Sequence, residues 1–421
     1  MTLVRLSPSG ELLGLRVTPP EMRSAEPDAP ADFAPLLRVA GLSHLRYRPT
    51  TPVTNPPVYS NRQAAWLGFV PGLPETRLRV EAAALAGAPV YFEKSYGFGP
   101  TATDLTINKS FLRAGQVLQV LVFIAAMIGA SFMARHNLRL GRSDRRGAMR
   151  LAGGVAVLSF AAWLLRADHV AVFRAEVDML LVAAGRTLSW AALCWLFYVA
   201  LEPYARRRWP DMLISWNRLL AGRLRDPLVG RDIIIGALFG IFGIVVTAAR
   251  HYAPAWFGVA PPRPDAPPPM TLLGLRYEVA QLLANTTDAL VLPMALFVLL
   301  VVLIVALRKR WLGMFAFHAT VTCAATLLTM KAGTSGQVNA IYFGVLVAAL
   351  LFLLMRFGLL AVIIALFYMM LLENYPITAD VHAWYAGASF FALGLASLLA
   401  LYGYLISVRG RPLGLAPAFK S

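Results

Sequence analysis

Apolar residues dominate nine segments between residues 114 and 408, and most of these segments are long enough to span a lipid bilayer. About 20 apolar residues cross the roughly 30 Å of bilayer hydrocarbon. The pattern therefore predicts nine membrane-spanning helices, at Ala114–Ala134, Leu151–Leu165, Leu180–Leu201, Ile233–Ala249, Ala289–Leu307, Leu312–Met330, Ile341–Met355, Phe357–Leu372 and Ala386–Ser407.

Two features of this pattern leave the number of spans open. Leu151–Leu165 is short for a bilayer, and only Arg356 separates Ile341–Met355 from Phe357–Leu372. The latter pair is interpreted either as two helices or as one bent segment.

The first 110 residues have the alternation of a small folded domain instead. Leu13, Leu15 and Val17 alternate with Gly14 and Arg16, as in a half-buried strand. The other predicted elements are a strand and turn at Leu3–Gly10, a short helix through Phe33, Leu36, Leu37 and Ala40, an extended stretch at Pro49–Pro57, and strands at Arg77–Leu85 and Pro89–Lys94 joined through Ala86-Gly87-Ala88.

The predicted fold class is thus a membrane all-α polytopic bundle with a small N-terminal α+β extramembrane domain. We place the domain at residues 1–110, the bundle at 111–410 and a short tail at 411–421. Composition agrees, because 58% of the 421 residues are hydrophobic and only 14% are charged, whereas about 25% are charged in a soluble domain.

The net charge of +17 comes mostly from arginines in short loops beside the apolar segments, which argues against a nucleic-acid partner. Alternate loops carry these cations, so the positive-inside rule predicts an extracytoplasmic N-terminal domain and a cytoplasmic C-terminus. The cationic residues are Arg135, Arg139, Arg142, Arg145, Arg146, Arg150, Arg206, Arg207, Arg208, Arg218, Arg223, Arg225, Arg231, Arg308, Lys309, Arg310, Arg356, Arg409 and Arg411.

One cationic loop contains its own amphipathic pattern. In Asp211–Leu224, apolar residues recur at helical spacing between Arg218 and Arg223. Two interpretations are open, a helix lying in the membrane interface and a helix packed against neighbouring loops.

The predicted orientation conflicts with the start of the chain. Met1–Gly10 shows no basic region followed by an apolar one, so no signal sequence accounts for export of the N-terminal domain. We therefore expect the sequence to be a fragment, or a gene whose start lies within a longer ancestral protein.

Ionisable residues within or beside the spans are the candidate functional groups, because charge is costly at membrane depth. They serve either to line a solute path or to form interhelical hydrogen bonds. The candidates are Arg186, Glu202, Asp288, His318, Lys331 and Arg356.

Small residues form one face of the fourth predicted span, at Gly236, Gly240 and Gly243. Such a face allows two helices to approach closely. The pattern fits contact within the fold and contact between two copies of the chain equally.

Catalytic motifs are missing from the sequence. It has no His-Glu-x-x-His, no Gly-x-Ser-x-Gly and no phosphate-binding glycine loop. Cys194 and Cys323 do not have the spacing of metal ligands. We therefore expect no catalytic residue, no metal and no cofactor.

Two cationic loops carry a family resemblance. They contain the stretches ARHNLRLGRSDRRGA from residue 134, and LEPYARRRWP, LISWNRLL and GRLRDPLVGRD between residues 201 and 232. Both resemble cytoplasmic loops in the C-terminal membrane region of certain bacterial transmembrane serine/threonine protein kinases. The kinase motifs themselves are absent, including the glycine-rich loop, His-Arg-Asp and Asp-Phe-Gly, so the resemblance carries over no catalytic residue.

The resemblance implies a sensor or anchor module in a bacterial inner membrane, which passes an external signal to cytoplasmic partners. Its expected partners are the lipid bilayer, an extracytoplasmic ligand and a cytoplasmic kinase or signalling protein. A small-solute permease is the alternative, and a membrane enzyme of another type is a third possibility.

Overall fold

A computed structural model of the 421-residue chain describes residues 2–7, 10–18, 30–42, 48–53, 55–70, 73–96, 109–169, 171–256, 269–329 and 336–408. The predicted tail at 411–421 lies outside these residues. The chain forms two compact units. The first comprises residues 1–109, 251–264 and 330–335, and the second comprises residues 110–250, 265–329 and 336–421.

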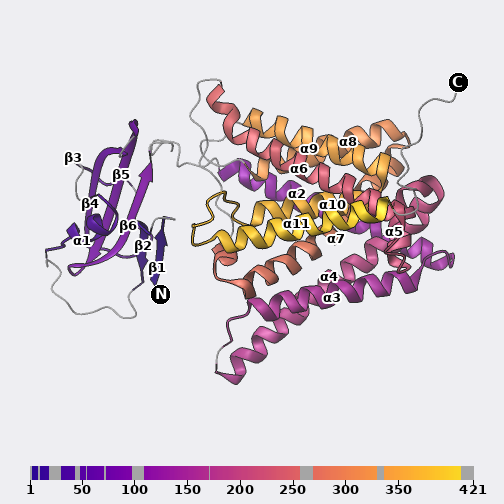
Figure 1. The fold of residues 1–421 in the computed structure, drawn as a ribbon, viewed down its shortest axis with the longest axis horizontal. Coiled ribbons are helices and arrows are strands. Elements are labelled where there is room, and N and C mark those ends of the chain that lie inside the picture. Colours follow the sequence, from indigo (N-terminus) through magenta and orange to yellow (C-terminus); the bar gives the residue numbers. More distant parts are fainter. Residues whose placement is uncertain are drawn as a thin grey trace. The chain divides into compact units, whose positions relative to one another are not determined.

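The first unit is built on a six-stranded antiparallel sheet with the strand order β1-β2-β6-β5-β4-β3 (Figure 1). The four predicted strands are present, and β3 and β4 are additional ones. The strands are β1 (Thr2–Leu6), β2 (Leu12–Val17), β3 (Arg48–Thr50), β4 (Arg62–Val70), β5 (Leu73–Leu85) and β6 (Ala88–Tyr96). The β5–β6 hairpin turns through Ala86 and Gly87, both with positive φ, as a two-residue hairpin loop requires.

One face of the sheet packs against the predicted helix, α1 (Ala34–Val39). Leu78, Val80 and Phe92 are almost fully buried on this face, and Leu36 and Leu37 of α1 pack against them. This apolar layer gives the small α+β unit its own core.

The opposite face carries charged residues and is crossed by the extended stretch that follows β3. Glu81 accepts a hydrogen bond of 3.0 Å from the Val53 N–H and is paired with Arg79 at 2.7 Å. Farther along the same stretch, Val58 packs against Ala83 and Tyr91. The sheet is therefore covered on both faces, by a helix on one and by an extended segment on the other.

The second unit is helical in the residues described. Its nine apolar helices are α2 (Lys109–Arg139), α3 (Arg145–Arg166), α4 (Phe173–Arg208), α6 (Pro227–Trp256), α7 (Leu275–Leu307), α8 (Arg310–Leu328), α9 (Gly336–Phe357), α10 (Leu359–Asn374) and α11 (Ala386–Ser407). Shorter helices are η1 (Pro210–Leu213), α5 (Ile214–Leu220) and η2 (Pro269–Leu272). Eight of the nine are long and apolar enough to cross a membrane, and α10 is shorter, with 16 residues.

The structure corrects two predicted boundaries. The short span Leu151–Leu165 is part of a 22-residue helix, α3, because the polar turn before it is helical as well. Phe357 belongs to α9, and the break from α10 comes at Gly358, whose φ is 98°. The N–H of Gly358 donates to the carbonyl of Leu354 at 3.1 Å, which closes the end of α9.

The cationic segment between α4 and α6 packs against this break. Met212, Leu213 and Trp216 are buried, whereas Leu224 is exposed. A Cβ atom on Gly358 would collide with the Met212 carbonyl oxygen. Met212, Leu213 and Trp216 therefore pack into the helical core, against α4, α9 and α10 and not against neighbouring loops, and the interfacial interpretation of Asp211–Leu224 stays a prediction.

The glycine face of α6 packs against α10. A Cβ atom on Gly236 would lie 2.6 Å from the Ala361 carbonyl oxygen, and one on Gly243 would lie 2.6 Å from Met369 Sδ. Gly240 lies between them against Ala365. Because the contacts advance in the same direction along both helices, α6 and α10 are parallel, and this face is filled from within the fold.

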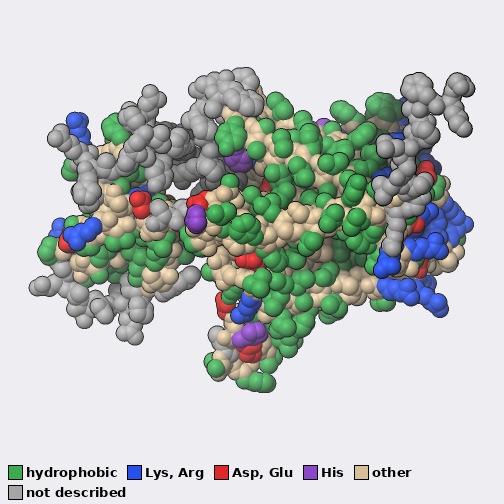
Figure 2. All heavy atoms as spheres, viewed as in Figure 1, with side chains coloured by type: hydrophobic (Ala, Val, Ile, Leu, Met, Phe, Trp, Pro, Cys, Tyr) green, Lys and Arg blue, Asp and Glu red, His purple; other side chains and the backbone are tan. Residues whose placement is uncertain are grey.

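The cationic loops lie at one end of the helical unit. Asn137 at the end of α2 donates to the Val199 carbonyl near the end of α4 at 3.1 Å, and Arg310 at the start of α8 lies 5.6 Å from the Trp209 ring. Figure 2 shows the blue Lys and Arg side chains gathered at this end, with hydrophobic side chains along the flank of the helices. We call this end the basic end.

Candidate functional site

Polar side chains from three helices join at the end of the bundle opposite the basic end. Arg166 of α3 donates to Gln281 Oε1 of α7 at 2.9 Å. Gln281 and Asn374 of α10 each donate to Asn285 Oδ1 at 2.8 Å, and Asn285 donates to the Met370 carbonyl at 3.3 Å. We call these residues the amide network. Every residue of the amide network takes part in at least one of these hydrogen bonds. The network therefore links α3, α7 and α10.

Two predicted candidates lie beside the amide network. Gln281, Asn285 and Asp288 follow one another at i, i+4 and i+7, which puts them along one side of α7. The half-buried Asp288 carboxylate interacts electrostatically with Arg186 of α4 and with Arg166. Arg186 itself is exposed on the outside of the bundle. The structure thus places Asp288 within electrostatic range of Arg186 and of Arg166, which sequence reasoning missed, but Asp288 forms no ion pair with either arginine.

The remaining candidates are scattered. Glu202 is buried near the end of α4 and forms an ion pair with Arg206, one turn further on. His318 lies in the middle of α8, where its Nε2 is 2.9 Å from the Gly344 carbonyl oxygen.

Arg356 is exposed at the end of α9, with its guanidinium carbon 5.4 Å from the centre of the neighbouring Phe357 ring. Lys331 lies outside the described residues. The ionisable candidates therefore do not converge on one site in the described part of the bundle.

A second polar cluster joins α6 to α9. Arg250 Nε donates to Asn339 Oδ1 at 2.8 Å, and its guanidinium lies 5.0 Å from the centre of the Tyr342 ring. The Tyr342 and Thr247 hydroxyl oxygens are 2.9 Å apart. Sequence reasoning missed this cluster, although Arg250 directly follows the predicted span that ends at Ala249.

A cavity of about 50 Å³ lies within the bundle, and its lining is apolar. It lies among α7, α8, α9 and α10, next to Pro293, which interrupts the hydrogen bonding of α7. The lining residues are Pro293, Leu296, Phe297, Phe317, Val321, Val347, Leu350, Leu351, Leu354 and Val362. With no polar side chain in this wall, the cavity suits only an apolar group. Nor do the described residues contain a group of three His, Cys, Asp or Glu residues that could hold a metal ion.

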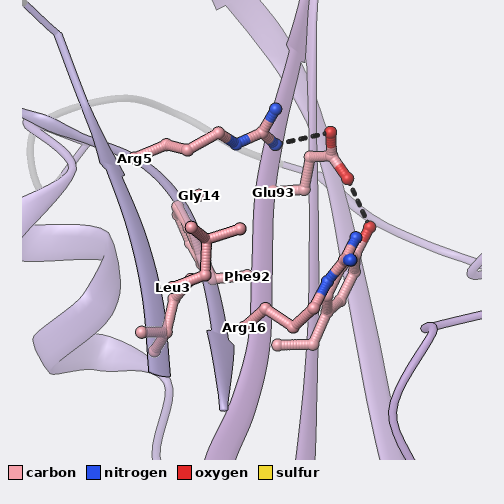
Figure 3. Close-up of a pocket in the computed structure, with 8 residues that line it drawn as sticks. Leu3, Arg5, Gly14, Arg16, Phe92 and Glu93 are labelled. Carbon is pink, nitrogen blue, oxygen red and sulfur yellow. Dashed lines mark hydrogen bonds and ion pairs between the residues drawn. The ribbon is translucent and has the colours of Figure 1, made fainter. Parts of the chain in front are cut away.

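A pocket of different chemistry lies in the first unit, on the sheet face opposite α1. It has a volume of about 140 Å³ and is lined by residues of β1, β2 and β6 (Figure 3). Strand register places Arg5 opposite Gly14 and Gly14 opposite Glu93, so these residues form one row across three strands. Leu3, Arg16 and Tyr91 form the adjacent row.

Both carboxylate oxygens of Glu93 are engaged within this pocket. Arg5 Nη2 lies 2.8 Å from Oε1, and the Tyr91 hydroxyl donates to Oε2 at 2.5 Å. Burial raises the pKa of the Tyr91 hydroxyl, and the hydrogen bond to Glu93 raises it further. Tyr91 therefore stays protonated at neutral pH and remains a donor to Glu93.

The chain matches no protein-family model, no curated protein and no solved structure. Its function is therefore inferred from the chemistry of these clusters.

Proposed function

We propose that the protein is a membrane-embedded sensor or anchor module. In this proposal the first unit binds an extracytoplasmic ligand, and the helical unit relays its presence to cytoplasmic partners. The observation that supports this assignment is the contrast between the two pockets. The pocket on the sheet is lined by charged groups, whereas the cavity within the bundle is apolar.

The proposed topology has about nine transmembrane helices, with α10 included as a short ninth span. The basic end would face the cytoplasm, since positively charged loops are retained there. The first unit would then lie outside the cytoplasm of a bacterial inner membrane. A reporter enzyme fused at residue 50 tests this orientation, and cytoplasmic reporter activity would overturn it.

The proposed partner is a cytoplasmic kinase or signalling protein that docks at the basic end. The loop stretches that resemble those of transmembrane serine/threonine kinases follow α2 and α4, whose ends meet at the basic end. Because the chain lacks the metal-binding and catalytic motifs of a kinase, the proposal assigns phosphoryl transfer to a separate protein or domain.

A small-solute permease is the second candidate. It is favoured by the charged residues Arg186 and Asp288, which lie inside or beside predicted spans and within electrostatic range of each other.

Flux measurements separate these two candidates. The full-length protein is reconstituted in liposomes, and uptake of labelled amino acids, sugars and organic acids is measured under sodium, potassium and proton gradients. A sensor gives uptake equal to that of protein-free liposomes. Uptake that exceeds this background and is abolished by Asp288→Asn would overturn the sensor assignment and support the permease.

A further inference from the structure

The pocket on the sheet exists because of a glycine. A Cβ atom on Gly14 would lie 2.8 Å from Arg5 Nε, too close for the guanidinium to keep its place. With no side chain at Gly14, Arg5 lies flat across β2 and reaches Glu93 (Figure 3). Arg5 and Arg16 both line the pocket that results.

The charges in the pocket do not balance. Glu93 has both oxygens engaged, by Arg5 and by Tyr91. Arg16 points toward Glu93 from the other side of the pocket in Figure 3, but it forms no ion pair with any described residue. Two guanidinium groups and one carboxylate leave one net positive charge. Such a pocket complements a ligand with a single negative charge.

The lining selects the chemical class of that ligand. A guanidinium binds a planar carboxylate with two parallel hydrogen bonds, and Arg16 is exposed and able to do so. Leu3 adds an apolar wall to the same pocket (Figure 3). A dianion such as sulfate, or a phosphate ester with about 1.5 to 2 negative charges at neutral pH, would exceed the net charge of the pocket and repel Glu93.

We propose that this pocket binds a small monocarboxylate, with Arg16 as the group that holds the carboxylate and Leu3 as the contact for a short apolar tail. Glu93 and Tyr91 are positioning residues, since they fix Arg5 and set the net charge. This inference rests on the proposed sensing function and names the ligand class of its extracytoplasmic unit.

Equilibrium dialysis with radiolabelled butyrate tests the proposal, using the full chain in nanodiscs of zwitterionic lipid at constant ionic strength. Butyrate should bind, whereas neutral butanol and the dianion sulfate should compete with it poorly. Arg16→Gln should weaken butyrate binding roughly tenfold to a hundredfold, the usual effect of losing hydrogen bonds to a charged group. The matched control is Arg38→Gln, which removes the same charge from exposed α1, on the opposite face of the sheet, and should leave binding unchanged.

A second variant gives a result that loss of folding cannot mimic. Glu93→Gln raises the net charge of the pocket to two, so butyrate should bind more tightly and sulfate should begin to compete. The proposal is overturned if wild-type protein does not bind butyrate, if Arg16→Gln and Arg38→Gln bind it equally, or if Glu93→Gln weakens binding in a protein that unfolds at the wild-type temperature. The sensor assignment is tested separately, by the flux measurement and the reporter fusion. A failure to bind butyrate would therefore overturn the ligand class without overturning the sensor assignment.

Discussion

The two ends of the helical bundle hold their polar groups by different chemistry. The basic end uses ion pairs, among them Arg218 with Asp226 at 2.7 Å and Arg231 with Asp232 at 2.8 Å. The opposite end contains the exposed pair of His169 with Glu176 at 2.9 Å, but its buried contacts include neutral amides, with Asn285 accepting from two neighbouring side chains. Only one guanidinium, that of Arg166, belongs to the amide network.

This difference follows from how each kind of group responds to its surroundings. Ion pairs depend on pH and salt, and they contribute little when exposed to water. Amide hydrogen bonds do not titrate, and a buried amide that loses its partner is destabilising. We therefore expect the ion pairs of the basic end to respond to pH and salt and the neutral amides of the amide network to be insensitive to them.

The largest expected effect comes from the turn at the basic end. Gly358→Val adds a side chain that collides with the Met212 carbonyl and imposes a branched residue on a φ of 98°. We expect a loss of about 3 kcal/mol or more in the free energy of unfolding. Unfolding in detergent, followed by tryptophan fluorescence, measures it.

The matched control is Gly394→Val in α11. Gly394 lies within a helix, and a Cβ atom added to it would meet nothing within 4 Å, so its substitution should cost less than about 1 kcal/mol. If both variants unfold at the same denaturant concentration, the packing of η1 against Gly358 does not hold the basic end together.

The next largest effect is expected at the amide end. Asn285→Leu removes the acceptor of Gln281 and Asn374 and leaves both donors without it. Interhelical hydrogen bonds in membranes contribute about 0.6–1.7 kcal/mol each, so we expect a loss of about 2 kcal/mol. Ser189→Ala is the control, because Ser189 is exposed and bonds only within its own helix. Equal stability of the two variants would contradict a structural role for the network.

A smaller effect should reveal the pH dependence of the basic end. Burial acts to raise the pKa of Asp226, but hydrogen bonds from Arg218 and from the Leu228 N–H outweigh it and lower the pKa below its usual 3.8. The pKa of Asp226 is lower in the folded state than in the unfolded state, where it is about 3.8. The stabilisation that its ionised carboxylate provides is therefore complete above pH 3.8, and it is lost as the pH falls through the folded-state pKa.

Asp226→Asn should therefore cost about 1 kcal/mol at pH 7, and the difference from wild type should shrink toward zero in acid. Urea unfolding across this pH range measures it. Asn285→Leu, measured in parallel, should lower the free energy of unfolding by the same amount at every pH. A pH-independent Asp226→Asn penalty would show that the ion pair does not stabilise this end.

The smallest effect is expected for the exposed arginines. Arg356 contacts the neighbouring Phe357 ring and lies at the surface. Arg356→Gln should change the unfolding free energy by less than about 0.5 kcal/mol. Thermal unfolding measures this change. If Arg356→Gln lowers the unfolding free energy by more than about 1 kcal/mol, the cations of the basic end stabilise the fold in addition to giving this end its positive charge.

Much of the fold could be predicted because its signals are local. Nine apolar runs became nine helices, and the alternation around Leu15 became β2. The strand β4 was missed because Leu67 and Phe69 are exposed and its apolar pattern does not mark a buried face. The break at Gly358 was also missed, since the charge of Arg356 is the more conspicuous interruption of the apolar run.

The candidate sites were less predictable because they depend on tertiary contacts. Asp288 and Arg186 stood out as charges within or beside apolar segments. Their neighbour Arg166 lies at the end of another helix, and only packing brings it to α7. The pocket on the sheet required the register of three strands, which places Gly14 between Arg5 and Glu93.

The parallel packing of α6 against α10 also constrains the order in which the chain can assemble during synthesis. Gly240 and Tyr368 are in close contact, yet 128 residues separate them in the sequence. At about 5–20 residues per second, α10 leaves the ribosome on the order of ten seconds after α6. During that interval the glycine face of α6 lacks the partner that fills it in the finished fold, so this contact is one of the later ones to close.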